Sequence, residues 1–422
     1  LDHRDVSLRV VYEMGDLLDV SLYGDYIDRD YGRPGVEPPK YTEDFWVEGL
    51  QVYGERDASR LDRGGDKDGH LVLEIKSEPL SWLGLGVRGD YTQMRNYNYA
   101  RWVTGFPPFV PYAAPGNVTW TTNEVLGIEG NVTIEPVEDA KLLLGAEHEA
   151  YDWENIRINV NGSGDKIRNT KLETEKDLYT TGLFAEAQYR PCKYVKGLAG
   201  MRYESHSEFG HAYLPRVGII FNPFKNTAIK ASHGRHFRAP TPNALFWPED
   251  PFAKGNPDLD PEKGWHTDVT FEQSLFDDKV FLTASYFHWD LDNKILWGPD
   301  SAGVWMPENL KRYKANGIEV GAKVGPFYNL TLNLNYTYQH AKERSKAFSK
   351  QQYAFGPIAA DFHSHWVDRR ATYTPKSLFK GSLTYESPWG MTATAVFRYV
   401  GNRVFYNTET DKAYPKTKTV RY

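Results

Sequence analysis

The chain has 422 residues, of which 40% are hydrophobic and 25% charged, and its formal net charge is −6. It has no basic face and no run of lysine and arginine, so we predict no nucleic-acid partner. No apolar stretch approaches the length of about 18 residues that a membrane-spanning helix needs, so a helical membrane protein is excluded. A lipid-facing β-barrel fits the mean hydropathy of −0.60, because only every second residue of its strands is apolar.

Aromatic residues make up 14% of the chain, with 28 tyrosines and 12 tryptophans. This content suits the aromatic belts that membrane proteins place at lipid–water interfaces, although an aromatic-rich protein that binds sugars would look similar. The chain opens at Leu1 without an initiating methionine or an export signal, which indicates a mature or truncated chain. Its single cysteine, Cys192, permits no internal disulfide.

Three segments show strands with one apolar face. Residues 179–189, 328–338 and 389–399 carry apolar side chains at alternate positions and an aromatic residue at each end, ten residues apart. At about 3.3 Å per residue and a tilt of about 45°, this span projects to roughly 23 Å. An outer-membrane barrel has an apolar band of about 25 Å between aromatic girdles. A soluble sandwich also alternates, so the paired aromatic ends are what favour a membrane barrel.

The connections between strands alternate in length. Tight turns are predicted at 13–19, 136–139, 191–194, 222–226, 276–278, 325–327 and 388–390, and long loops near 96–119, 154–175, 238–263, 297–313 and 343–366. Short turns on one rim and long loops on the other are typical of outer-membrane barrels, whose short turns are periplasmic. We count roughly 16 to 18 strands by alternation and turn chemistry.

Residues 29–68 are predicted to lie mostly in an extracellular loop, because one complete strand over 42–55 would break the alternation of the rims. Asp62, Asp66 and Asp68 in this region superficially resemble a calcium loop, but the ligand spacing and closing glutamate of an EF-hand are absent. We interpret them as a solvated acidic loop.

A proline-rich motif lies between two alternating segments in the second half of the chain. Its residues are Phe237, Arg238, Ala239, Pro240 and Thr241, followed by Gly255, Asn256, Pro257, Leu259, Pro261 and Glu262. Prolines cannot donate the hydrogen bonds of a sheet, so this is a loop between strands. Together with residues 200–203, 215–218 and 316–319, the motif resembles the signature of TonB-dependent outer-membrane receptors, the siderophore- and cobalamin-type importers.

The resemblance implies an all-β fold, a large antiparallel transmembrane β-barrel of about 22 strands with a plugged lumen. We expect residues 1–422 to be one barrel domain, truncated at both ends and without the N-terminal plug domain. The implied location is the outer membrane of a Gram-negative bacterium, in contact with lipid and lipopolysaccharide. The implied function is import of an iron-siderophore, haem or cobalamin-class solute, energised by the inner-membrane TonB complex through the plug.

Aromatic and histidine side chains of the long loops are the candidates for cargo binding. They are Tyr97, Tyr99, Trp102, Phe106, Trp247, Trp305, His363, His365 and Trp366. The competing interpretation is that about half of them pack the loops or form the outer girdle.

No pattern for catalysis or for a cofactor is present. A phosphate-binding GxxxxGK[ST] loop and a GxSxG nucleophile element are absent. The histidine pairs at 233 and 236 and at 363 and 365 lack a third ligand at metal-site spacing. We therefore predict no enzyme, no cofactor and no metal site. The alternatives to an importer are a passive porin-like or adhesin-type barrel and, less favoured, a soluble glycan-binding β protein.

Overall fold

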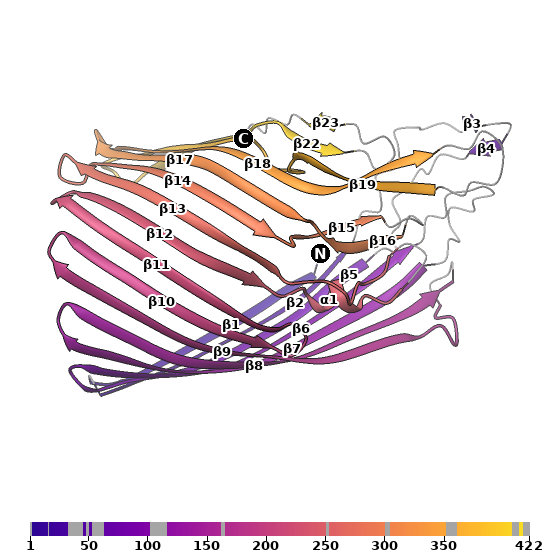
Figure 1. Cartoon of the computed structure of the whole chain (residues 1–422), viewed down its shortest axis with the longest axis horizontal. Helices are drawn as coiled ribbons and strands as arrows, with labels where there is room; N and C mark the ends of the chain where they lie inside the picture. Colours follow the sequence, from indigo (N-terminus) through magenta and orange to yellow (C-terminus); the bar gives the residue numbers. More distant parts are fainter. Residues whose placement is uncertain are drawn as a thin grey trace.

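The computed structural model describes residues 2–15, 17–32, 45–47, 50–52, 63–101, 116–161, 165–249, 253–299, 304–351, 361–406 and 413–416. Within these ranges the chain is almost entirely antiparallel strand, and 17 strands belong to one sheet (Figure 1). Among the described residues, no helix has the length and apolar character needed to cross a membrane.

The elements follow one another in this order: β1 (Asp2–Met14), β2 (Leu18–Gly32), β3 (Phe45–Val47), β4 (Leu50–Val52), β5 (Arg63–Leu80), β6 (Leu83–Arg101), β7 (Gly116–Val137), β8 (Ala140–Val160), β9 (Leu172–Cys192), β10 (Val195–His206), β11 (Gly210–Phe224), β12 (Thr227–Arg238), α1 (Pro242–Phe246), β13 (Glu262–Leu275), β14 (Val280–Asp292), β15 (Ile295–Pro299), β16 (Trp305–Asn309), β17 (Arg312–Phe327), β18 (Leu330–Gln351), β19 (Asp361–Arg370), β20 (Ser377–Glu386), β21 (Thr392–Val400), β22 (Arg403–Tyr406) and β23 (Ala413–Lys416).

Each strand of the large sheet pairs with its neighbour along the chain. β2 pairs with β5, β14 with β17, and the small pairs β3–β4, β15–β16 and β22–β23 stand apart from the sheet. β18 pairs with β20 over residues 330–338 and with β19 over residues 342–351, so β19 and β20 share one position in the wall. The sheet curves until β1, β2, β5 and β6 lie behind β9–β11 (Figure 1). The predicted all-β, antiparallel barrel class is confirmed.

The predicted apolar faces point outward. Tyr179 and Tyr189 on β9 are 53% and 57% exposed, whereas Thr180 and Glu186 on the opposite face are each 8% exposed. Tyr338, at the end of the second predicted face, is 47% exposed. A strand whose outer face meets lipid would show this pattern, because the apolar side chains find no protein to cover them.

The inner face is polar, and its charges are paired across strands. The Arg202 guanidinium on β10 lies 2.8 Å from the Glu147 carboxylate on β8 and 2.5 Å from that of Glu204. Gly182 on the intervening strand β9 leaves the room: a Cβ there would lie 2.3 Å from Arg202 Nη2. Arg216 with Glu186, and Lys230 with Glu272, form similar inner-face pairs. The inner face of the curved wall is thus polar.

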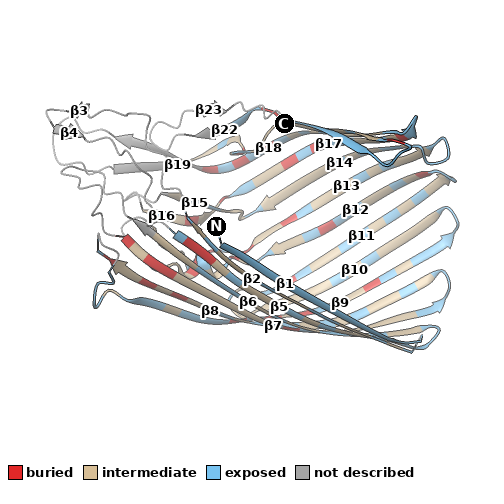
Figure 2. Cartoon of the chain, turned by 180° about the vertical axis from the view of Figure 1, so that it is seen from behind, coloured by how far each residue is buried: buried red, intermediate tan, exposed pale blue. Residues whose placement is uncertain are grey.

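Several predicted loops were too long. β6 reaches Arg101 and β7 begins at Gly116, β8 reaches Val160 and β9 begins at Leu172, and β18 reaches Gln351 before β19 begins at Asp361. The loop predicted over 297–313 contains the β15–β16 hairpin. The ends of these strands were not predicted because both of their faces meet polar surroundings, so their sequences do not alternate between apolar and polar residues. The buried residues of β7 and β8 lie toward this long-loop rim (Figure 2).

The prediction for residues 29–68 was partly wrong. β2 continues to Gly32 and β5 already begins at Arg63. Asp66 and Asp68 therefore lie on a strand, where their carboxylates are 3.6 and 3.7 Å from the Arg29 guanidinium of β2. They are paired acids of the wall rather than a solvated loop. Asp62 falls outside the described residues.

Candidate functional site

The described parts of the segment that joins β12 to β13, residues 239–249 and 253–261, fold inward at the long-loop rim and are called the clasp here. Its short helix α1 lies close to the point where β12 ends (Figure 1). Trp153, on the inner face of β8 and only 2% exposed, packs against Phe246 with ring centroids 6.2 Å apart. Arg157 Nη1 donates to the carbonyl of Pro248 over 3.3 Å. The clasp thus reaches from β12 across to β8.

The first half of the motif builds α1. Thr241 caps the helix, because its Oγ1 accepts a hydrogen bond from the backbone N–H of Ala244 over 3.3 Å. Proline follows at the first helical position, where no N–H is needed. Ala244 and Leu245 then pack on Leu259, and all three are at most 4% exposed. Phe209, from the connection between β10 and β11, packs against this cluster.

The second half of the motif positions the backbone of the clasp where the chain turns back toward β13. A Cβ on Gly255 would lie 2.5 Å from the carbonyl oxygen of Leu245 and 2.6 Å from the nitrogen of Trp247, so no side chain fits there. Asn256 donates from Nδ2 to the carbonyl of Pro307 over 2.9 Å. The clasp is therefore bonded to β16 as well as to β8.

The two ends of the motif meet at the base of the clasp. Arg238 and Glu262 are register partners, and Nη1 lies 3.7 Å from Oε1. The same Oε1 accepts a hydrogen bond from the backbone N–H of Ile295 over 2.8 Å. Close by, the Lys294 ammonium lies 3.8 Å from the ring centroid of Tyr313. Burial lowers the pKa of Lys294, against the opposing effect of the Glu343 and Glu262 carboxylates.

An aromatic cluster lies on the inner wall below the clasp. The ring of His236 on β12 stacks on Trp289 of β14 at 5.0 Å, and its centroid is 4.2 Å from that of His266 on β13. His236 Nε2 and His266 Nδ1 are buried and have no hydrogen-bond partner in the described part of the chain. The two histidines border a cavity of about 410 Å³ that Arg202 and Arg216 also line.

The clasp brings together two of the predicted cargo residues. Trp247 and Trp305 are linked through backbone hydrogen bonds from Gly255 N to Trp247 O and from Lys254 N to Trp305 O, each 2.9 Å. The Trp247 indole N–H is buried, and no described residue accepts its hydrogen bond. Trp305 is 49% exposed. These two side chains remain cargo candidates.

The other predicted cargo residues lie elsewhere. The Tyr97 hydroxyl donates to Asp30 Oδ1 of β2 over 2.7 Å, and Tyr99 is the register partner of Arg63 and Val118. Lys311 Nζ lies 4.9 Å from the Trp366 ring centroid. Trp102 and Phe106 lie outside the described residues. The backbone at 363 and 365 belongs to β19, but the side chains of His363 and His365 lie outside the described part.

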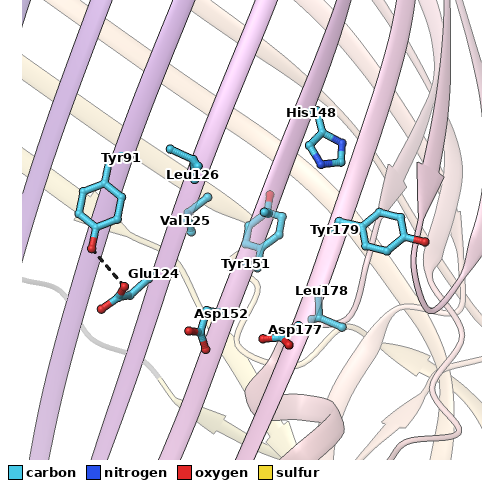
Figure 3. A pocket seen from close by; sticks show the side chains of 11 residues that line it. Tyr91, Glu124, Val125, Leu126, His148, Tyr151, Asp152, Asp177, Leu178 and Tyr179 are labelled. Atoms are coloured by element: carbon cyan, nitrogen blue, oxygen red, sulfur yellow. Dashed lines mark hydrogen bonds between the residues drawn. The ribbon is translucent and has the colours of Figure 1, made fainter.

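A second depression, of about 500 Å³, lies along β7–β9 on the other side of the wall from the lumen (Figure 3). The Tyr91 hydroxyl donates to Glu124 Oε2 over 3.1 Å. Strand register places Glu124, Asp152 and Asp177 directly opposite one another on β7, β8 and β9. Figure 3 shows their carboxylates in a row across the three strands.

Metal binding finds no support in the described residues, where no group of three or more histidine, cysteine, aspartate or glutamate side chains is placed to hold an ion. His233 stacks on Trp265, which is 40% exposed on the outer face, and its ring centroid is 4.8 Å away. His236 points to the inner face instead. The two histidines therefore do not form a ligand pair.

Sequence reasoning missed the buried inner face of β8. Trp153, Asn155 and Arg157 alternate along this strand and are at most 4% exposed. Residues 154–175 were predicted as a loop, so the facing of these side chains was not considered. The alternation of a tryptophan, an amide and a guanidinium at every second position was the available signal.

The family model described as TonB dependent receptor-like, beta-barrel, matches residues 3–420. The vitamin B12 transporter BtuB of Vibrio vulnificus is 30% identical over 174 residues, 41% of this chain and 26% of that protein. BtuB of Photobacterium profundum is 24% identical over 227 residues, 52% of this chain and 35% of that protein.

Solved structures share the fold. A mutant of the ferric enterobactin receptor PfeA from Pseudomonas aeruginosa has a TM-score of 0.67 and 14% identity, covering 98% of this chain and 60% of its own. The siderophore receptor PirA from Acinetobacter baumannii has a TM-score of 0.68 and 14% identity, covering 98% of this chain and 62% of its own.

This chain therefore spans less than two thirds of each of these relatives. The family and its neighbours are receptors and transporters, which confirms the expectation that the chain is not an enzyme. Because the family model covers nearly the whole chain, the chain belongs to the TonB-dependent receptor family and corresponds to its β-barrel.

Proposed function

We propose that this chain is the barrel of an importer in the outer membrane of a Gram-negative bacterium, and that its cargo is a scarce iron-siderophore, haem or cobalamin-class solute. The clasp carries the proposal, because it closes over the inner wall and presents aromatic and polar groups at the mouth of a polar lumen. The Trp247 indole N–H is buried and has no acceptor among the described residues, so it becomes a donor for cargo when cargo displaces part of the clasp. Names of relatives support the cargo class: two are vitamin B12 transporters and others are siderophore receptors.

The paired charges of the inner wall support a path for a polar solute. A water-filled passage lined by Arg202, Glu147 and Glu186 accepts a large hydrophilic cargo without the cost of dehydrating it fully. Movement against a gradient needs energy, and this proposal assigns it to the TonB complex acting through a plug domain in the lumen. His236 and His266 line the cavity of about 410 Å³ on this wall, where such a plug or cargo would contact their side chains.

Growth on defined nutrient sources tests the proposal. A strain lacking the gene is supplied with ferric siderophores, haem or cyanocobalamin as the only usable source, with and without the full-length receptor. We expect growth on one class to depend on the receptor and to stop when the TonB complex is inactivated. Equal growth of all strains on every source would reject import, and growth independent of the TonB complex would identify a passive pore.

A binding measurement locates the cargo. Trp247→Phe removes the indole donor and keeps most of the aromatic surface, so we expect at least about 10-fold weaker binding of the cargo found by growth. Trp389→Phe, at the short-turn rim and 74% exposed, is the matched control and should bind normally. Unchanged affinity for the Trp247 variant would remove this residue from the site.

A further inference from the structure

Three cations on the inner face of β17, β20 and β21 have no partner of opposite charge. Lys323, Lys380 and Arg398, called the basic strip here, are exposed and form no ion pair with any described residue. Alternation along the strands places them inside, because Leu383 and Phe397, which are 44% and 46% exposed, belong to the apolar outer face. The basic strip therefore faces the lumen.

Strand register places the three cations close together. Lys380 on β20 is directly opposite Arg398 on β21, and both stand in the register row of Asn335 on β18. Lys323 on β17 is the register partner of Asn333, two residues along β18 from Asn335. Two strand spacings and two residues separate the backbones of Lys323 and Lys380, which corresponds to about 12 Å. One solute with several anionic groups can contact all three cations across this distance.

The fold leaves the charge of the basic strip largely uncompensated. Lys380 and Arg398 are like charges on directly opposed positions, an arrangement that destabilises a pair of strands. The inner-face carboxylates closest to the strip by register are Glu319 of β17 and Glu272 of β13, and Glu272 is paired with Lys230 at 2.7 Å. Three cations and the one carboxylate of Glu319 leave a formal charge of +2.

The wall across the lumen pairs its cations instead. Arg202 of β10 contacts Glu147 and Glu204, and Arg216 of β11 contacts Glu186. β17 and β18 lie across the curved wall from β8 and β9 (Figure 1). A negatively charged solute in the lumen is therefore attracted to the basic strip rather than to β8–β11.

Amide and hydroxyl side chains surround the basic strip. Asn335 lies beside Gly321, where a Cβ would be 3.2 Å from Asn335 Oδ1 and 2.5 Å from Thr283 Oγ1, so no side chain fills the wall at this point. Asn333 Nδ2 donates to Ser382 Oγ over 3.5 Å. Groups of this kind donate hydrogen bonds to the oxygens of an anion while the cations neutralise its charge.

We infer that the basic strip binds carboxylate groups of the cargo, and that the cargo is an anionic metal chelate with several exposed carboxylates. Three cations within reach of one solute favour a polyanion over a neutral molecule, because each cation adds a charge-assisted hydrogen bond. The strip lies on strands other than β8, β12, β13 and β16, which hold the clasp, so it serves passage rather than capture. The inference rests on the import proposed above, and it narrows the cargo to solutes with free carboxylates.

Citrate, a tricarboxylate, is the probe for the basic strip, and calorimetric titration at low ionic strength measures its binding to the purified full-length receptor. The strip variant combines Lys323→Gln, Lys380→Gln and Arg398→Gln. We expect the wild type to bind citrate and the variant to bind it at least about 10-fold more weakly, since each exposed ion pair contributes up to about 5-fold in affinity. Added salt should weaken binding by the wild type.

A matched control removes the same two lysines and one arginine from the outer face. It combines Arg235→Gln, Lys263→Gln and Lys342→Gln on β12, β13 and β18, and it should bind citrate as the wild type does. The uncharged trimethyl ester of citrate should bind to none of these proteins. If the strip variant fails to fold, Lys380→Gln alone should bind citrate about 2- to 5-fold more weakly, and Lys380→Arg, which keeps the charge, should bind it normally.

Equal affinity of the wild type and the strip variant for citrate would overturn the inference, and so would an equal loss in the outer-face control. Failure of the wild type to bind citrate would also overturn it, because carboxylates of the protein itself would then occupy the basic strip. Growth on nutrient sources does not enter this measurement. A receptor that supports growth without strip-dependent citrate binding keeps the import proposal and loses the basic strip, whereas the reverse result keeps the strip as an anion site and rejects import.

Discussion

The two faces of this wall handle charge differently. On the inner face of β8–β11 opposite charges meet across strands, as Arg202 of β10 does with Glu147 of β8. On the outer face opposite charges also meet, as Asp290 does with Arg312 and Lys314, but like charges stand opposite one another as well. Glu124, Asp152 and Asp177 stand opposite one another on one side of the wall, and Lys314 and Lys342 on another.

The difference separates charges that are neutralised by partners within the fold from charges that face solvent and ions. An inner-face ion pair needs no outside partner, so it holds strands together in the lumen. The repulsion within an outer-face row of like charges is weakened by screening and by neighbouring cations, such as Arg95 at 3.7 Å from Glu124. We therefore expect the inner-face pairs to stabilise the wall and the outer-face rows of like charge to oppose its stability. Substitutions on the two faces should have opposite effects on stability.

The largest effect on structure and on cargo binding is expected for a substitution in the clasp, which covers part of the inner face. Gly255→Val places side-chain atoms against the backbone of Leu245 and Trp247, which must move. Overpacking of this kind costs typically about 1–3 kcal/mol, and here we expect the clasp to detach from β16. Limited proteolysis should then cut within residues 239–261, and cargo binding should fall by more than about 10-fold.

Gly89→Val on β6 is the matched control for the clasp, because a Cβ at this position meets no atom within 4 Å. It should retain the protease resistance and cargo affinity of the wild type. If Gly255→Val were equally resistant, the clasp would not depend on this close approach.

The second largest effect is a loss of stability on removing an ion pair from the inner face. Arg202→Met leaves the carboxylates of Glu147 and Glu204 without their shared partner, on side chains that are only 26% and 16% exposed. Breaking a fully buried pair costs about 3–5 kcal/mol, and partial exposure reduces this to roughly 1–3 kcal/mol. Chemical unfolding in detergent measures the change. Lys342→Met on the outer face is the control and should not lower stability, since its register partners on β17 and β19, Lys314 and Arg370, are also cations.

Sequence reasoning correctly predicted the parts of the fold that can be recognised from the residue pattern of one strand alone. The alternation over residues 179–189 and 328–338 correctly predicted outward-facing strands, because lipid and lumen make different demands on neighbouring residues. The ends of β8 and β9 were missed, since both faces meet polar surroundings there. The location of the motif between two strands was also predicted correctly.

The sites themselves depend on register, which a single sequence does not reveal. His236 and His266 are thirty residues apart, and they meet on neighbouring strands only because β12 pairs with β13 in this alignment. The opposition of Lys314 to Lys342 arises in the same way. The motif residues were predicted only as a family signature. Their contacts in the structure give a physical reason for them: at Gly255, for example, any side chain would collide with the backbone of Leu245 and Trp247.

A third and smaller effect is expected on the acidic side of the outer face. Asp152→Asn removes the middle charge of the row that Glu124 and Asp177 complete, and so relieves two repulsions at once. Each like-charge pair costs roughly 0.2–1 kcal/mol, so this variant should be more stable than the wild type by about 0.5–1 kcal/mol at low ionic strength. Salt should shrink the gain, because screening already weakens the repulsion in the wild type.

Glu138→Gln in the turn between β7 and β8 is the control for Asp152→Asn and should change stability little. Destabilisation by Asp152→Asn at low salt would mean that the carboxylate row contributes to the fold rather than opposing it. The distinction between the two faces would then hold only for the opposed cations Lys314 and Lys342.

The smallest effect is expected for Lys342→Gln, which relieves the repulsion with Lys314. The free energy of unfolding should rise by about 0.2–0.5 kcal/mol in nonionic detergent, at the lower end of the range for a like-charge pair because a lysine ammonium on a long side chain can move away from its neighbour. Chemical unfolding in this detergent measures the change. A loss of stability would show that Lys342 stabilises the wall rather than repelling Lys314.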